Sequence, residues 1–97
     1  MYARVTRWEG ATPDELRKMA EQINSSDGPP PGVPAKGIMV LADHENGRSV
    51  TVTLFETEDD LREGDKTLQG MNPDPGFSGR RASLEMYEVA VDRRVDG

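Results

Sequence analysis

Two segments of the chain carry the same kind of helix-start signal, and each follows a segment typical of a β-strand. In Thr12-Pro13-Asp14-Glu15 the threonine can cap a helix, the proline suits the first helical turn, and Glu15 can return a hydrogen bond to the cap. Thr57 is followed by three acidic residues, which the positive N-terminal end of a helix favours. These signals predict two helices, each reached from a strand, and this alternation restricts the possible folds more than any other feature of the chain.

The spacing of apolar residues predicts the extent of both helices. The first runs from residue 13 to about residue 24 or 25, because apolar residues recur there at helical intervals. These residues are Leu16, Met19, Ala20 and Ile23. The second runs from about residue 58 to residue 70, with Leu61, Leu68 and Met71 on its buried side. Gly64 lies on the same stripe, where glycine lowers helix propensity by ~1 kcal/mol relative to alanine but permits close approach to another backbone.

Four segments alternate in the manner of β-strands, namely residues 2–8, 38–43, 48–57 and 82–91. Residues 44–47 supply a turn between the second and third segments, in which Asn46-Gly47 predicts a β-hairpin. The order strand, helix, strand, strand, helix, strand is that of ferredoxin-like α+β folds. We therefore predict one domain over residues 1–97, with a four-stranded antiparallel sheet, its first and third strands central and both helices on one face.

Neither face of this sheet is polar enough to be fully solvated. The third strand offers Val50, Val52 and Leu54 on one side, and its other side carries Phe55 beside two threonines. The last strand is also apolar on both sides. Since two helices cover only one face, a second surface should cover the other, and another copy packed around a two-fold axis is the simplest one. We predict a homodimer, and the alternative is a monomer with an amphipathic sheet face.

A long connection rich in proline and glycine separates the first helix from the second strand. Residues 24–37 include three consecutive prolines, a composition that permits neither a helix nor a strand ladder. A loop of this length is uncommon in a small domain. The sequence leaves open whether residues 28–34 bridge a wide gap, form a lid or bind a partner.

The composition excludes several classes of protein. The chain has no cysteine, which removes disulfides, thiolate metal sites and cysteine nucleophiles. Its 12 basic and 18 acidic residues give a net charge of −6, which disfavours nucleic acid as a partner. The longest apolar run, residues 38–42, is far shorter than the ~20 residues that span a bilayer, and the N-terminus has no apolar signal region. We expect a cytoplasmic protein that binds neither membranes nor nucleic acid.

Four stretches together resemble one superfamily in element order over almost the whole chain. They are residues 2–10, residues 40–43 with the Asn46-Gly47 turn, residues 49–58 and residues 85–89. Their pattern resembles the antibiotic biosynthesis monooxygenase-like dimeric α+β barrels. The resemblance implies a homodimer whose two sheets form an eight-stranded barrel, with a ligand pocket between helices and sheet. The superfamily includes cofactor-independent oxygenases of quinol-like aromatics, haem-degrading enzymes and many proteins without known activity.

Haem and metal sites are not expected in this chain. Haem-degrading members of the superfamily carry a histidine on the second helix and an asparagine on the first strand, and this sequence has neither. Its single histidine, His44, is predicted at the hairpin tip between two acidic residues, where a solvated turn residue is the simplest interpretation. One histidine cannot supply the converging ligands of a structural metal site. We therefore predict no cofactor and no metal.

One group of residues on the first strand is a candidate ligand site. Tyr2, Arg4, Thr6 and Trp8 share strand parity, so two aromatic side chains flank two polar ones on one face. This face could line a pocket for an aromatic ligand, with Arg4 stabilising a phenolate or a dioxygen anion. The same residues could equally lie in a dimer interface or at a sheet edge.

Two functions remain open on these grounds. The first is a small homodimeric α+β barrel protein that binds an apolar or aromatic ligand without chemistry. The second is a cofactor-independent monooxygenase acting on a quinol-like or polycyclic aromatic. No acid–base pair, nucleophile triad or phosphate-binding loop in the sequence identifies a catalytic residue.

Overall fold

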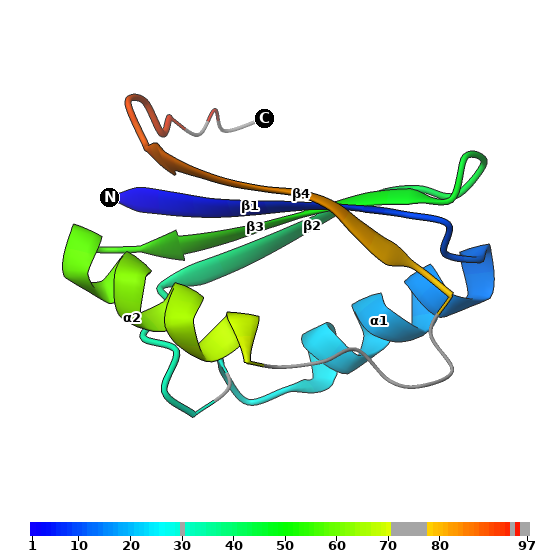
Figure 1. Cartoon of the computed structure of the whole chain (residues 1–97), viewed down its shortest axis with the longest axis horizontal. Coiled ribbons are helices and arrows are strands. Elements are labelled where there is room, and N and C mark those ends of the chain that lie inside the picture. Colours follow the sequence, from blue (N-terminus) through cyan, green and yellow to red (C-terminus); the bar gives the residue numbers. More distant parts are fainter. Residues whose placement is uncertain (30, 71–77, 94, 96–97) are drawn as a thin grey trace.

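The elements follow the predicted order in a computed structural model that describes residues 1–29, 31–70, 78–93 and 95. Three come from the first half, β1 (Tyr2–Glu9), α1 (Pro13–Ser25) and β2 (Gly37–Asp43). The others are β3 (Arg48–Phe55), α2 (Glu58–Gln69) and β4 (Arg80–Glu88). The strands form one antiparallel sheet in the order β2-β3-β1-β4, so the first and third strands are central, as predicted. Both helices lie on the same side of the sheet (Figure 1), which confirms the ferredoxin-like α+β fold.

Both helices begin at the threonines identified in the sequence. The Thr12 hydroxyl accepts a hydrogen bond from the backbone N–H of Glu15 (3.2 Å), and Glu15 Oε1 accepts one from the backbone N–H of Thr12 (3.0 Å). The Thr57 hydroxyl accepts from the backbone N–H of Asp60 in the same way (3.1 Å). Each bond satisfies a backbone donor that the first helical turn would otherwise leave unpaired.

Two strands end at other residues than predicted, because neighbouring segments of the same chain determine where they end. The last strand was expected over residues 82–91 but runs from Arg80 to Glu88, because it pairs with β1, whose ends pair as Glu9 with Arg80 and Tyr2 with Glu88. The third strand ends at Phe55 rather than residue 57, since Thr57 is already the cap of α2. α2 ends at Gln69, and Met71, expected on its buried side, falls outside the described residues.

The apolar core lies at the end of the sheet that α2 covers. Phe55 is completely buried and packs with Leu61 and Val33. Gly64 faces the Phe55 ring so closely that a Cβ at this position would lie 2.6 Å from Phe55 Cζ. The close approach predicted for Gly64 is therefore real, but its neighbour is an aromatic ring rather than a backbone.

The proline-rich loop contributes one side chain to this core. Val33 is buried in the cluster, and the hydroxyl of Thr67 on α2 donates to the Gly32 carbonyl (3.1 Å). The backbone N–H of Lys36 then donates to the Leu54 carbonyl (2.7 Å) and leads into β2. Outside Pro30, which is not described, residues 28–34 therefore bridge α1 and β2 and supply a core side chain.

Candidate functional site

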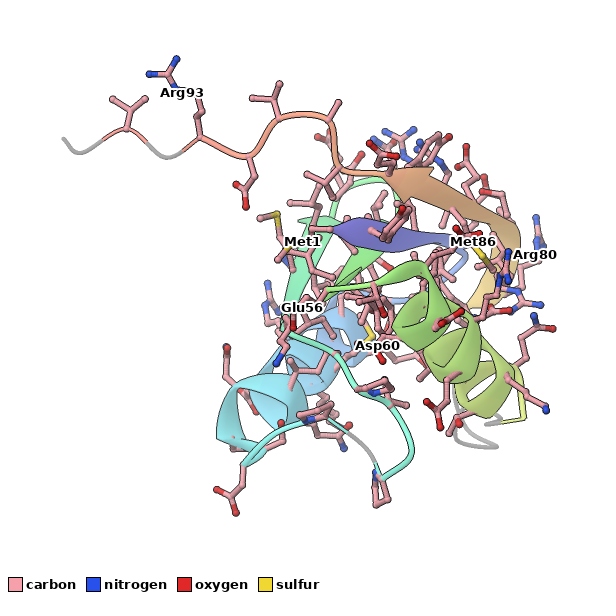
Figure 2. All side chains as sticks on the ribbon, turned by 90° about the vertical axis from the view of Figure 1, so that its left-hand side faces the viewer. Met1, Glu56, Asp60, Arg80, Met86 and Arg93 are labelled. Atoms are coloured by element: carbon pink, nitrogen blue, oxygen red, sulfur yellow. The ribbon has the colours of Figure 1, made fainter. Side chains whose placement is uncertain are left out.

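The strand register brings the four candidate residues to one side of the sheet, the side that faces the helices. Tyr2, Arg4, Thr6 and Trp8 pair across β1 and β3 with Phe55, Thr53, Thr51 and Ser49, respectively. Phe55 belongs to the core under α2, and Arg4 bonds to Asp65 of α2. Figure 2 shows Met86, the β4 partner of Arg4, on this same side. We call this surface the helix-facing side.

The helix-facing side is unusually polar for a surface covered by helices. Four of its polar residues are buried, with exposed fractions of 6% for Arg4, 4% for Thr6, 3% for Ser49 and 7% for Thr53. Burial of polar groups is unfavourable unless each finds a hydrogen-bond partner. The partners of these groups therefore indicate whether this layer is an ordinary core.

Arg4 has a charged partner that sequence analysis did not identify. Its Nε donates to Asp65 Oδ1 at 2.8 Å, and Asp65 Oδ2 accepts a hydrogen bond from Gln69 Nε2, also at 2.8 Å. The two charged side chains are 7% and 15% exposed. Among the described residues, the two terminal amino groups of Arg4 donate to none. The sequence signal for Asp65 was its place four residues after Leu61, on the buried stripe of α2.

A second buried polar group lies further along the same side. The Ser49 hydroxyl is fully buried and has no hydrogen-bond partner within the described part of the chain. Ser49 lies opposite Trp8, whose side chain is half-buried. α1 covers this end of the sheet (Figure 1) but buries only Leu16 completely, and the rest of its apolar stripe stays half-buried.

The opposite surface of the sheet, which we call the open face, is largely apolar. Met39, Leu41 and Tyr87 are 47%, 52% and 52% exposed on it. Between them the central strands place half-buried valines and a leucine. These residues are Val5, Val50, Val52 and Leu54. The sheet thus buries polar residues next to the Phe55 core beneath its helices, and it is largely apolar where nothing covers it within the described chain.

Charged residues surround a hollow at the hairpin end of the sheet. The hollow measures about 380 Å³, and its lining includes Leu41 and Val50 of the open face together with Trp8 and Ser49 of the helix-facing side. Asp43 and Arg48, also in its wall, pair at 2.6 Å. Hydrogen bonds from the Asn46 side chain and then from Arg48 lower the pKa of Asp43 to about 2.

A polar cluster joins β1 and β4 beside this hollow. Arg7 Nε donates to Glu85 Oε1 at 2.9 Å, and the Tyr87 hydroxyl donates a very short hydrogen bond to Glu85 Oε2. The bond from Tyr87 and then that from Arg7 lower the pKa of Glu85, and the carboxylate in turn raises the pKa of Tyr87. The open face therefore carries compensated charges at one end of a largely apolar surface.

His44 lies exposed in the turn between β2 and β3, where the sequence placed it. The described residues contain no group of three histidine, aspartate or glutamate side chains that could hold a metal ion. Over the same residues, no helix has the length and apolarity needed to cross a membrane.

Comparison of the chain with family models, with curated proteins and with solved structures gives no match. The fold and the side chains described above are therefore the basis for any assignment of function.

Proposed function

We propose that this chain forms a homodimeric α+β barrel and that each copy holds a small, largely apolar or aromatic ligand between its sheet and its helices. The observation that carries the proposal is the polarity of the sheet, which buries Arg4, Thr6, Ser49 and Thr53 beneath the helices beside the Phe55 core and leaves a largely apolar open face. A self-sufficient monomer would favour the reverse arrangement, because apolar side chains are most stable where helices remove them from water.

The ligand part of the proposal rests on the helix-facing side. Small-molecule sites combine apolar walls with a few placed polar groups. Here Tyr2 and Trp8 lie at the two ends of β1, and the buried Arg4 and Thr6 lie between them. Arg4 and Ser49 both keep hydrogen-bonding capacity that the described residues do not use.

The dimer part rests on the open face. Four strands of about eight residues form a flat area of roughly 20 Å by 26 Å, or about 500 Å², before the added surface of the side chains is counted. A standard interface buries about 800 Å² per partner, so the flat area of this face alone supplies roughly 60% of that size. A second copy offers the same apolar surface around a two-fold axis, and the paired charges of Arg7 with Glu85 and Arg48 with Asp43 limit the electrostatic cost of covering it.

The oxygenase alternative depends on Arg4 as a positive donor toward a developing anion. Asp65 lies 2.8 Å from Arg4 and compensates its charge, which weakens the positive potential available for catalysis. This pairing favours binding over oxygen chemistry. A cytoplasmic location accompanies the proposal, supported by the absence of cysteine from the sequence.

Titration calorimetry with hydroquinones and naphthol tests the function. We expect saturable binding that weakens in Arg4→Ala and Trp8→Ala and is unchanged in His44→Ala, a turn residue on neither face. We expect no oxygen uptake with the same compounds. Uptake that Arg4→Ala abolishes would favour the monooxygenase, and no saturable binding to any compound would contradict both functions.

A further inference from the structure

We infer that the two copies of the proposed dimer join along β2, whose outer edge pairs with the same edge of the second copy. This inference rests on the proposed dimer and states which strands close its barrel. It concerns the two outer strands of the sheet, β2 and β4, each of which has one edge that no other strand pairs within the described chain (Figure 1).

β2 is an apolar strand that water reaches from both faces. Met39 and Leu41 are 47% and 52% exposed on the open face. Ile38 and Ala42 lie on the helix-facing side, yet Ile38 is 50% exposed and Ala42 is exposed as well. From residue 37 to residue 42 the strand carries no charged or polar side chain. A single copy therefore leaves most of an apolar strand in contact with water, and an interface would remove it from water.

β4, the opposite outer strand, carries charges of the kind that protect an edge from pairing. Arg80 and Arg81 begin it, Glu85 lies within it and Glu88 ends it. Exposed edge strands pair with other strands unless charged side chains, prolines or bulges prevent it. β2 has neither charge nor proline between residues 37 and 42. This difference between the two outer strands selects β2 as the edge at which the copies meet.

The charges at the two ends of β2 fit antiparallel pairing of the strand with itself. Lys36 precedes the strand and Glu45 follows it, and both are exposed. Lys36 has an exposed ion pair with Glu56 at 3.7 Å, and Asp43 is compensated by Arg48 at 2.6 Å. Around a two-fold axis, the start of each strand lies beside the end of the other. Each Lys36 then lies near Glu45 of the second copy, whereas parallel pairing would bring like charges together.

The alternation of side chains restricts the register of this pairing. Opposed residues of antiparallel strands point to the same face, so under a two-fold axis one residue must lie opposite itself. Val40, the middle residue of β2, gives the register that pairs the whole strand. Met39 then meets Leu41 on the open face and extends the interface proposed there, while Ile38 meets Ala42 on the helix-facing side. The second pair lies outside the barrel, where a charged substitution at Ile38 stays in water.

Cysteine cross-linking tests the inference directly, because the chain has no cysteine of its own. Val40 lies opposite itself in the inferred register, with Cα atoms about 4.5 to 5.5 Å apart, a separation that a disulfide spans. We expect Val40→Cys to form a covalent dimer under mild oxidation at least about tenfold faster than Met86→Cys. Met86 is the matched control, because it is an exposed apolar residue (42%) on β4, the other outer strand.

Amide hydrogen exchange of the unaltered protein provides a second measurement. The N–H groups on the outer edge of β2 should exchange at least about tenfold more slowly at a concentration where the protein is dimeric than where it is monomeric. Protection that appears only on addition of an extended apolar peptide would assign the edge to a foreign strand and overturn the inference.

Sedimentation velocity separates failure of this inference from failure of the proposed dimer. If the protein is dimeric but Val40→Cys cross-links no faster than Met86→Cys, the inference is overturned and the proposed dimer stands. Outer-edge amides that exchange as fast in the dimer as in the monomer would overturn it in the same way. A folded protein that is monomeric at every concentration would overturn both.

Discussion

Gly64 determines how closely α2 approaches the sheet. Alanine there would improve helix propensity by ~1 kcal/mol, but its Cβ would lie 2.6 Å from Phe55 Cζ. Overpacking of a core typically costs about 1 to 3 kcal/mol, so the net effect of Gly64→Ala is a loss of stability. We expect a lower urea midpoint. Gly28→Ala, where an added Cβ meets nothing within 4 Å, should leave the midpoint almost unchanged, and equal effects of both substitutions would contradict the packing shown by the structure.

Asp43 gives the hairpin a defined dependence on pH. Hydrogen bonds from Asn46 and Arg48 lower its pKa from 3.8 to about 2, so its contribution to stability is complete above about pH 4 and is lost as the pH falls toward 2. Carboxyl NMR titration should give a midpoint near 2 for Asp43. Asn46→Ala, which removes the largest cause, should raise that midpoint toward 3.8, whereas an unchanged midpoint would show that Asn46 does not set it.

At the scale of elements, the start of α1 depends on a cap that also holds a distant segment. Glu15 accepts hydrogen bonds from the backbone N–H groups of Thr12 (3.0 Å) and Ser78 (2.7 Å). These bonds, that from Thr12 first, lower the pKa of Glu15. The capping box therefore links the N-terminus of α1 to the residues just before β4.

Removing the cap should destabilise the protein measurably. Thr12→Ala deletes the side-chain acceptor for the N–H of Glu15, and loss of such a cap costs about 1 kcal/mol. Denaturant unfolding followed by circular dichroism measures this cost. Gln22→Ala, in the exposed interior of the same helix, should change stability little, and a Thr12→Ala variant as stable as Gln22→Ala would show that the cap contributes nothing.

For the whole molecule, neighbouring residues of β2 provide a direct test of the dimer. Met39 lies on the open face and Ile38 on the helix-facing side, and they are similarly exposed, 47% and 50%. Met39→Lys should convert a dimer into a monomer in sedimentation velocity, because it places a charge in the apolar interface. Ile38→Lys should remain dimeric. A folded unaltered protein that is monomeric at high concentration would contradict the proposed association.

Local chemistry in the sequence was sufficient to predict the elements. Both caps, the hairpin at Asn46-Gly47 and the alternation of Tyr2, Arg4, Thr6 and Trp8 involve residues only a few positions apart, so short-range geometry determines them. The order of the elements then limited the sheet to few topologies, and the predicted one is present.

Tertiary structure determined three features that no local sequence pattern contains: the face that the helices cover, the partner of Arg4 and the end of β4. Alternation along β1 shows which residues share a face but not which face the helices cover. The pairing of Arg4 with Asp65 joins residues 61 positions apart, and the end of β4 at Glu88 depends on where β1 begins. These features arise from contacts between distant segments, which form only when the whole sheet is assembled and the helices have packed against one side of it.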